Sequence, residues 1–286
     1  PSVRTMPMLS ARPSTVRLFL VSVACSPGTT TPLVTPGSDA AGTSITIGPD
    51  GLPIIAHLLS FPEIDLRVTF CETPDCSTFD LQTMETPGVD DGYNPSLTID
   101  PEGVPVIAYG DATNNRQMFL RCAPTCVDAT PVVVDDNGVA GIFTVLTIGT
   151  DGLPLIAYGE SFSGDVRVAH CGTLDCAPGS VTVNSIDTPP RDHLQKSLRI
   201  GIDGRPVITH VDHEADDLYV TLCGDPVCGN GNVTTLVAAN GVVGEFNSLT
   251  IGTDGIPIAA YYNETTGDLA LARIWRTGAS AHVWDS

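Results

Sequence analysis

Short apolar segments on either side of a polar turn set the local pattern of the chain. In residues 145–158, Val-Leu-Thr-Ile-Gly precedes Thr-Asp-Gly, and Leu-Pro-Leu-Ile-Ala-Tyr follows it. Asp-Gly between two such segments is a strong local signal for a β-hairpin, because glycine adopts the positive φ of a tight turn without steric cost. The pattern predicts two antiparallel strands that meet at Gly152.

This hairpin pattern occurs five times. The copies begin near residues 44, 96, 146, 197 and 248, and their turn glycines are Gly51, Gly103, Gly152, Gly204 and Gly255. Successive turn glycines are 52, 49, 52 and 51 residues apart. A constant period of this size indicates a repeat architecture in which each period is one supersecondary unit.

Each period has room for four strands. In the third copy we expect them at residues 145–149, 155–158, 166–170 and 181–186. The third strand recurs at 66–70, 117–121, 218–222 and 269–274, and the fourth at 79–84, 130–134 and 233–237. Four-stranded antiparallel meanders repeated at this period predict an all-β fold, a β-propeller in which radial repetition protects the sheet edges.

The ends of the chain decide the predicted number of blades. We expect residues 1–286 to form a single propeller domain, with five clear repeats in 44–286 and a degenerate N-terminal blade or closure segment in 1–43. Residues 16–34 carry patterns of a third and a fourth strand. We therefore expect six blades; five follow if this segment only closes the ring on the last repeat.

The repeat also resembles a known family. Its consensus is Ser-Leu-Thr-Ile-Gly-x-Asp-Gly-x-Pro-x-Ile-Ala-Tyr, followed by Gly-Asp-Leu-x-Val-Ala-x-Cys, and it extends from residue 44 to about residue 274. This consensus resembles a tandem repeat of large secreted bacterial proteins, mostly of unassigned function. The resemblance implies an extracellular propeller module and no particular activity.

Eight of the nine cysteines form close pairs in the sequence. The pairs are Cys71/Cys76, Cys122/Cys126, Cys171/Cys176 and Cys223/Cys228. A structural zinc ion needs four ligands, whereas a propeller would hold these pairs on separate blades. We therefore expect a disulfide bond within each of four blades, and hence an oxidising, extracellular location. Cys25 is left over, either free or paired between chains.

The net charge of the chain limits the kinds of molecule that it can bind. The 286 residues include 13 Lys and Arg against 33 Asp and Glu, a net charge of −20, and Lys196 is the only lysine. Such an acidic surface repels nucleic acid and anionic membranes. No apolar run is long enough for a membrane span. We expect no nucleic-acid partner and no membrane-spanning segment.

One repeat position suggests a ligand-binding face at the end of the sheets opposite the Asp-Gly turns, where the variable loops gather. The position closes the second strand of every copy and holds His57, Tyr109, Tyr158, His210 and Tyr261. A polar aromatic ring of this kind could bind sugar or peptide. The alternative is ordinary packing between sheets. We also expect the aromatic residues just before the first strand, such as Phe143 and Phe246, to be apolar plugs between sheets.

A cluster in the fourth copy suggests a metal site. Its members are His193, His210, Asp212, His213 and Glu214. Histidine with carboxylates can ligate zinc or another divalent cation, the only cofactor that the sequence suggests. The alternative is a solvated acidic loop. The turn aspartates, by contrast, supply too few oxygens for calcium, so we expect them to be turn formers.

No catalytic motif stands out. The chain has no Gly-x-Ser-x-Gly, no His-Glu-x-x-His and no Gly-rich phosphate loop. We therefore expect a non-catalytic, secreted binding or assembly module for protein, glycan or its own copies. The alternative is a secreted glycan hydrolase with carboxylates at the channel mouth.

Overall fold

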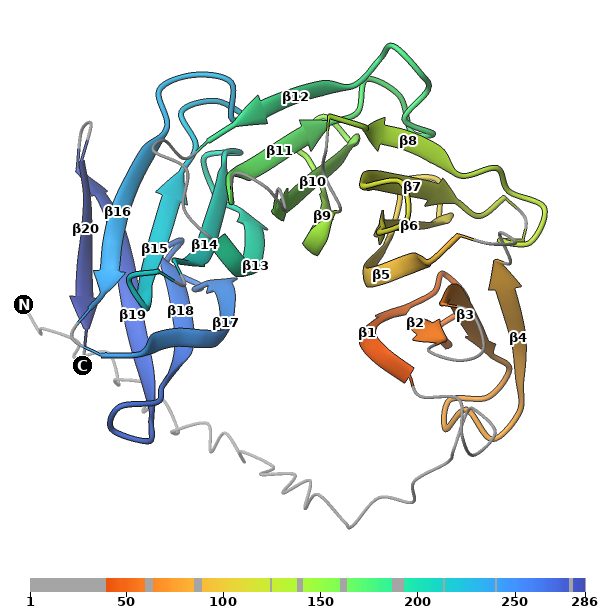
Figure 1. The fold of residues 1–286 in the computed structure, drawn as a ribbon, viewed down its shortest axis with the longest axis horizontal. Helices are drawn as coiled ribbons and strands as arrows, with labels where there is room; N and C mark the ends of the chain where they lie inside the picture. The colour runs from red at the N-terminus through yellow and green to blue at the C-terminus, as the bar shows by residue number, and fades with distance from the viewer. Residues whose placement is uncertain are drawn as a thin grey trace, which may run out of the picture. The chain divides into compact units, whose positions relative to one another are not determined.

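The computed structural model describes residues 40–59, 64–84, 89–123, 125–137, 141–159, 164–186, 193–212, 214–239, 241–277 and 280–285. These residues belong to one compact unit, Pro32–Ser286. They form five four-stranded antiparallel sheets arranged around a common centre, which is the architecture of a β-propeller (Figure 1). The predicted all-β fold is confirmed. None of the described residues belongs to a helix that could cross a membrane.

Every sheet is a meander of consecutive strands. The first two sheets contain β1 (Ala40–Ile47), β2 (Pro53–Leu59), β3 (Asp65–Cys71), β4 (Phe79–Met84), β5 (Asp91–Ile99), β6 (Pro105–Asp111), β7 (Arg116–Arg121) and β8 (Val132–Asp135). The third and fourth contain β9 (Ile142–Ile148), β10 (Pro154–Gly159), β11 (Val166–His170), β12 (Thr182–Ser185), β13 (His193–Ile200), β14 (Pro206–Asp212), β15 (Asp217–Leu222) and β16 (Val233–Ala238). The fifth contains β17 (Val243–Ile251), β18 (Pro257–Asn263), β19 (Asp268–Thr277) and β20 (Ser280–Asp285).

The turns between the first and second strands, Asp-Gly in four copies and Glu-Gly in the second, have the geometry that the sequence predicts. Gly51, Gly103, Gly152, Gly204 and Gly255 all have φ between 77° and 84°. In the first sheet the Asp50 carboxylate accepts the N–H of Leu52 at 3.0 Å. Asp151, Asp203 and Asp254 make the equivalent bond at 3.0, 3.2 and 3.1 Å. These carboxylates therefore fix the turn by bonding to their own backbone.

The core lies between the sheets. Ile54 and Val68 of the first sheet pack with Ile107 and Leu120 of the second in one buried cluster. Three further clusters join the second sheet to the third, the third to the fourth and the fourth to the fifth. Burying an aliphatic side chain completely stabilises a fold by about 1.5–3 kcal/mol. Most of the stability therefore comes from packing one sheet onto the next.

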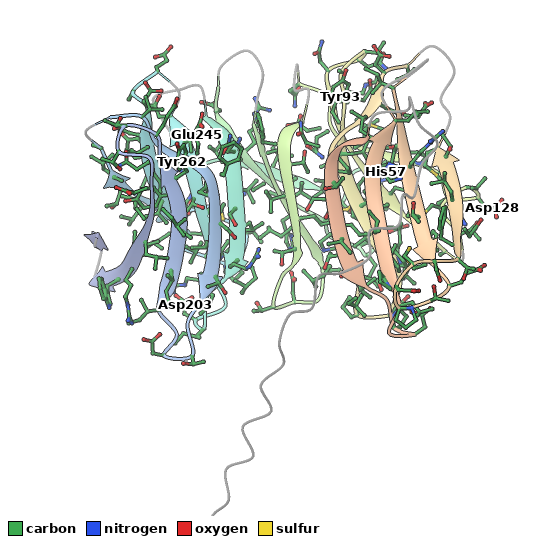
Figure 2. All side chains as sticks on the ribbon, turned by 90° about the horizontal axis from the view of Figure 1, so that it is seen from below. His57, Tyr93, Asp128, Asp203, Glu245 and Tyr262 are labelled. Atoms are coloured by element: carbon green, nitrogen blue, oxygen red, sulfur yellow. A yellow bond between two sulfur atoms is a disulfide. The ribbon has the colours of Figure 1, made fainter. Side chains whose placement is uncertain are left out.

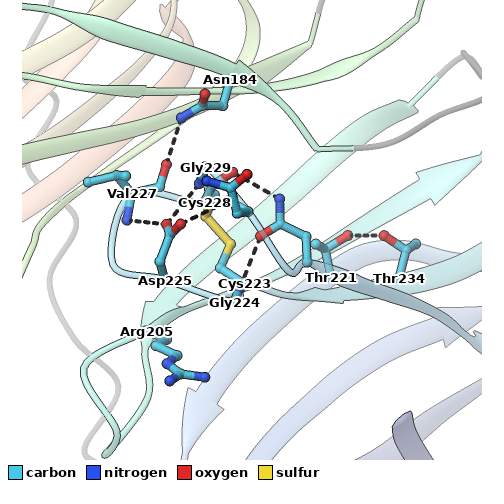
Figure 3. Close-up of a disulfide and its surroundings, with 12 residues drawn as sticks. Asn184, Arg205, Thr221, Cys223, Gly224, Asp225, Val227, Cys228, Gly229 and Thr234 are labelled. Atoms are coloured by element: carbon cyan, nitrogen blue, oxygen red, sulfur yellow. Dashed lines mark hydrogen bonds between the residues drawn. A yellow bond between two sulfur atoms is a disulfide. The ribbon is translucent and has the colours of Figure 1, made fainter. Parts of the chain in front are cut away.

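The predicted disulfides are present in the first four sheets, as Cys71–Cys76, Cys122–Cys126, Cys171–Cys176 and Cys223–Cys228. In the fourth sheet the Asp225 carboxylate accepts the N–H group of Val227 inside the cystine loop and those of Gly229 and Asn230 just after it (Figure 3). The Asn184 side chain of the third sheet donates to the Val227 carbonyl at 3.0 Å. The cystine loop thus contacts the neighbouring sheet.

A serine hydrogen bond joins neighbouring innermost strands. The N–H of Leu249 on β17 donates to the Ser197 hydroxyl oxygen on β13 at 3.0 Å. The Ser44–Leu97 and Ser96–Leu146 pairs repeat this bond between β1 and β5 and between β5 and β9. Val145 takes the serine position in the third sheet, so the bond is missing between β9 and β13.

The described part of the ring has two free flanks. The innermost strands pack in the order β1, β5, β9, β13, β17, and among the described residues β1 and β17 make no extensive contact. Ile45 on β1 is 64% exposed and Leu269 on β19 is 79% exposed. The predicted sixth blade and closure segment, residues 1–43 with the 16–34 patterns, fall almost wholly outside the described residues, as does Cys25.

We predict that the Ser197→Ala substitution lowers the free energy of unfolding by about 1–3 kcal/mol, because it leaves the buried N–H of Leu249 without its acceptor. Ser248 is the matched control, since it occupies the same repeat position in the fifth sheet but is exposed. Ser248→Ala should change stability by less than about 0.5 kcal/mol. Urea unfolding measures both variants; equal losses would contradict the assigned role of the serine bond.

Candidate functional site

Each innermost strand begins with a bulge whose central residue has a left-handed backbone. These residues are Gly42, Asn94, Phe143, Gln195 and Phe246, with φ of 57°, 46°, 50°, 40° and 52°. They occupy one equivalent position in the five repeats, at or beside the place where the strand slips in register against its partner. A bulge of this kind bends a strand and redirects the side chain that it carries.

The five bulges surround one cavity of about 470 Å³. All five innermost strands contribute to its lining, which consists of Gly42, Thr43, Asn94, Pro95, Phe143, Thr144, Val145, Gln195, Lys196, Phe246 and Asn247. Since the bulges begin strands that end at the Asp-Gly turns, the cavity lies at the opposite end of the sheets. Figure 2 shows Asp203 of a turn at one end, and Tyr93 and Glu245, which precede bulge residues, at the other.

The left-handed conformation is unfavourable for most of these residues. Glycine adopts it freely and asparagine tolerates it, whereas a bulky residue such as phenylalanine rarely does. The cost is of the order of 1–2 kcal/mol per residue. Phe143, Gln195 and Phe246 therefore hold a strained backbone, and all three face the same cavity. Strain of this kind concentrates at functional sites.

Hydrogen bonds between the fourth and fifth sheets hold two of the bulges. The backbone N–H of Phe246 donates to the Gln195 side-chain oxygen. Asn247 donates from its side-chain nitrogen to the Gln195 carbonyl at 3.0 Å and the Gly244 carbonyl at 3.2 Å. The Asn247 side-chain oxygen accepts the Thr209 hydroxyl at 2.6 Å. Each bulge therefore depends on its neighbour.

The third sheet fixes its bulge in the same manner. The Thr144 hydroxyl lies 2.7 Å from the Gly141 carbonyl and 3.0 Å from the side-chain oxygen of Gln117 on β7. Gln117 is buried and donates to the Tyr109 carbonyl at 3.0 Å. The polar contacts of Thr144 thus hold Phe143, its neighbour in sequence, in the left-handed conformation.

The chemical character of the cavity follows from its lining. The described lining residues include two phenylalanines, residues with side-chain amides, two threonines and Lys196, and none of these described residues is Asp or Glu. Phe246 is 75% exposed, so its ring is available to a ligand. Aromatic rings beside hydrogen-bonding groups suit molecules with both apolar faces and polar edges.

The five residues that the sequence suggested as a ligand-binding face lie in the core and do not line the cavity. His57, Tyr109, Tyr158, His210 and Tyr261 are all buried, with exposed fractions of 0–3%. The three tyrosines belong to the apolar clusters between sheets. This placement agrees with packing, the alternative that the sequence left open, and it keeps a ligand away from these side chains.

Two of these tyrosines are beside carboxylates. The Tyr158 hydroxyl donates to Asp135 of the second sheet at 2.8 Å, and Arg167 contacts the same carboxylate at 2.9 Å. Burial and the Asp135 charge raise the pKa of Tyr158. Burial, with the charges of Asp91 and Asp111, also raises the pKa of Tyr109. Both tyrosines therefore stay neutral, and the Tyr158 hydroxyl joins the third sheet to the second.

The predicted metal cluster divides between described and undescribed residues. His210 is buried, and its ring nitrogen lies 3.0 Å from the Thr221 hydroxyl. The Asp212 carboxylate accepts the N–H groups of Glu214 at 3.0 Å and Ala215 at 3.2 Å. His213 and the side chain of His193 are outside the described part. Within that part no group of three or more His, Cys, Asp and Glu converges, so the metal site stays a prediction.

The sequence pattern did not identify the residues that line the cavity, because it favoured Phe143 and Phe246 as apolar plugs between sheets. The exposure of Phe246 shows that this expectation was wrong for that residue. A signal was present in the alignment of the repeats. The same position holds Gly42 and Asn94, two residue types that favour a left-handed backbone.

Comparisons with known proteins support the fold. No protein-family model and no curated protein match the sequence. A solved structure of a protein of unknown function from Dyadobacter fermentans DSM 18053 has a TM-score of 0.60 at 10% identity, over 86% of this chain and 93% of that chain.

Two hydrolases have similar structures. An exo-beta-1,3-galactanase from Clostridium thermocellum has a TM-score of 0.53 at 10% identity, over 85% of this chain and 60% of that chain. An alpha-L-arabinofuranosidase from Lactobacillus brevis has a TM-score of 0.50 at 12% identity, over 84% of this chain and 91% of that chain. At such low identities these matches show a shared β-propeller fold and nothing about activity.

His57 gives the fold a dependence on pH. Burial, and then the charge of Arg67, lower the pKa of this histidine from its usual value of 6.5. As pH falls through about 6.5, the unfolded chain gains a proton that the folded chain resists, so the free energy of unfolding decreases. We predict that the wild type loses more stability than the His57→Gln variant between about pH 7.5 and about pH 5.5. Urea unfolding at both pH values measures the difference; identical losses would refute it.

Proposed function

We propose that this protein is a secreted binding module whose central cavity holds a saccharide without cleaving it. The observation that carries the proposal is the ring of left-handed bulges, which presents Asn94, Phe143, Gln195 and Phe246 to one cavity despite the backbone strain. The aromatic rings would stack on the apolar faces of a sugar, and the amides would bond to its hydroxyl groups.

The lining also argues against hydrolysis. Most glycosidases need two carboxylates on either side of the scissile bond, one of them acting as the proton donor. Among the residues that the structure describes, no Asp or Glu lines the cavity. The disulfides support secretion, because such bonds persist in oxidising compartments. The resemblance of the repeat to secreted bacterial propeller proteins supports the same location.

Hydrolysis is the second candidate, and two observations favour it. The galactanase and the arabinofuranosidase named above share the fold. In addition, Glu245 immediately precedes Phe246 on β17, opposite Tyr262 of β18 (Figure 2). This carboxylate would be one member of the pair that a hydrolase needs. Glu245 and its partner would both have to act from outside the described lining of the cavity.

The binding proposal is tested with the Phe246→Gly and Phe246→Ala variants. Both remove the ring, which should weaken saccharide binding by about 3- to 10-fold. Glycine also relieves the left-handed strain, as at Gly42, so Phe246→Gly should be more stable than Phe246→Ala by about 1 kcal/mol. If Phe246 served only the fold, removing its ring would not weaken saccharide binding in a Phe246→Gly variant that is more stable than Phe246→Ala.

Binding is measured by calorimetry against a panel of neutral and acidic oligosaccharides, and cleavage by the release of reducing ends. Leu269→Ala is the matched control, since Leu269 is also an exposed apolar residue but lies outside the cavity lining. Binding without cleavage, weakened only by the Phe246 changes, supports the proposal. Cleavage that Glu245→Gln abolishes would replace it with the hydrolase.

A further inference from the structure

A second cavity, of about 180 Å³, lies between the fourth and fifth sheets. Asp203 belongs to its lining and marks the end of the sheets at which it lies, opposite the bulges (Figure 2). Apolar residues of both sheets make up much of the lining, among them Ile202, Val207, Leu222, Ile256, Pro257 and Ile274. The cavity shares no described lining residue with the central cavity, so the two are separate sites.

A cystine fills the equivalent place between the other sheets. Ile54, Val106 and Leu155 hold one repeat position on the second strands of the first three sheets, and each shares a buried cluster with the cystine of the next sheet. Val207 holds this position in the fourth sheet, but the fifth sheet has no cysteine, and Ile274 stands at the first cysteine position. Both residues line the cavity, which therefore occupies the place of the missing cystine.

The residue that lies where this cavity meets solvent differs from its counterparts. Its turn position holds Pro49, Pro101 and Thr150 in the first three sheets and Ile202 in the fourth. Ile202 is 81% exposed, and its side chain lies over Gly255 of the fifth sheet, where a β-carbon would come within 2.5 Å of Ile202 Cδ1. So exposed an apolar side chain adds little to the stability of the fold, but it can cover a ligand held in the cavity.

We propose that this second cavity binds a small hydrophobic molecule through a single apolar ring. A cavity of about 150 Å³ lined by aliphatic side chains takes up benzene, so the space here has room for one ring. Val207 and Ile274 would contact the ring from either sheet, and Ile202 would cover it. An unfilled apolar cavity destabilises a fold, and the ring would restore the contacts that a cystine makes between the other sheets. This inference does not rest on the proposed saccharide binding.

The experiment compares two probes of the same shape, benzyl alcohol and pyridin-4-ylmethanol. They differ in one ring atom, and burying the pyridine nitrogen without a hydrogen bond is unfavourable. Ligand-observed NMR titration measures both affinities for wild type, Ile202→Ala and Val207→Phe. Ile202→Ala removes the cover of the cavity, and Val207→Phe places a ring of the protein inside it. Thr150→Ala is the matched control, because Thr150 is exposed and holds the same turn position in the third sheet.

We expect wild type to bind benzyl alcohol about 10-fold or more tightly than pyridin-4-ylmethanol. Ile202→Ala should weaken the binding of benzyl alcohol by about 3- to 10-fold, because less apolar surface is buried against the ring. Thr150→Ala should leave the affinity unchanged. Val207→Phe should abolish binding, since its own side chain occupies the space.

Three results would overturn the proposal: no binding of benzyl alcohol, equal affinities for the two probes, or equal effects of Ile202→Ala and Thr150→Ala. If Phe246→Gly weakens benzyl alcohol and Ile202→Ala does not, the ring enters the central cavity, and this site is likewise overturned. Should Val207→Phe fold poorly, the two turn variants decide, because both replace exposed residues. The saccharide titrations are separate measurements, so either proposal can fail while the other stands.

Discussion

Burial of one sheet against the next is the interaction on which the rest of this structure depends. A single four-stranded meander cannot cover both of its faces, so each sheet gains its core only from its neighbours. The buried clusters accordingly lie between sheets rather than within them. The same packing brings β1, β5, β9, β13 and β17 together at the centre and creates a common cavity there.

Crowding at the centre explains the form of the site. A bulge lets a strand turn away from its neighbours without ending its hydrogen bonds, and here it recurs at one position of every repeat. In the first sheet glycine meets the demand for a left-handed backbone. In the third and fifth sheets phenylalanine occupies the position in spite of the strain, which a fold alone does not require. Gly42 is the residue type that the architecture alone favours at this position. Phe246 costs the fold stability there, and its side chain is what a ligand would use.

Local features of the sequence were predictable, because their causes lie within a few residues. Asp-Gly turns and close cysteine pairs depend on neighbouring backbone, and both appear where expected. The side chain of His57 or Tyr109 was harder to place, since alternation along a strand does not tell which face meets another sheet. Phe246 was misplaced because a bulge shifts the alternation by one residue, and a pattern of period two cannot register that shift.

A crystal structure with a bound oligosaccharide tests the central claim most directly. The account predicts the sugar inside the central cavity, in contact with Phe143 and Phe246, with the five bulges still left-handed. A sugar bound on the outer strands or the cystine loops, with the cavity holding only water, would contradict it.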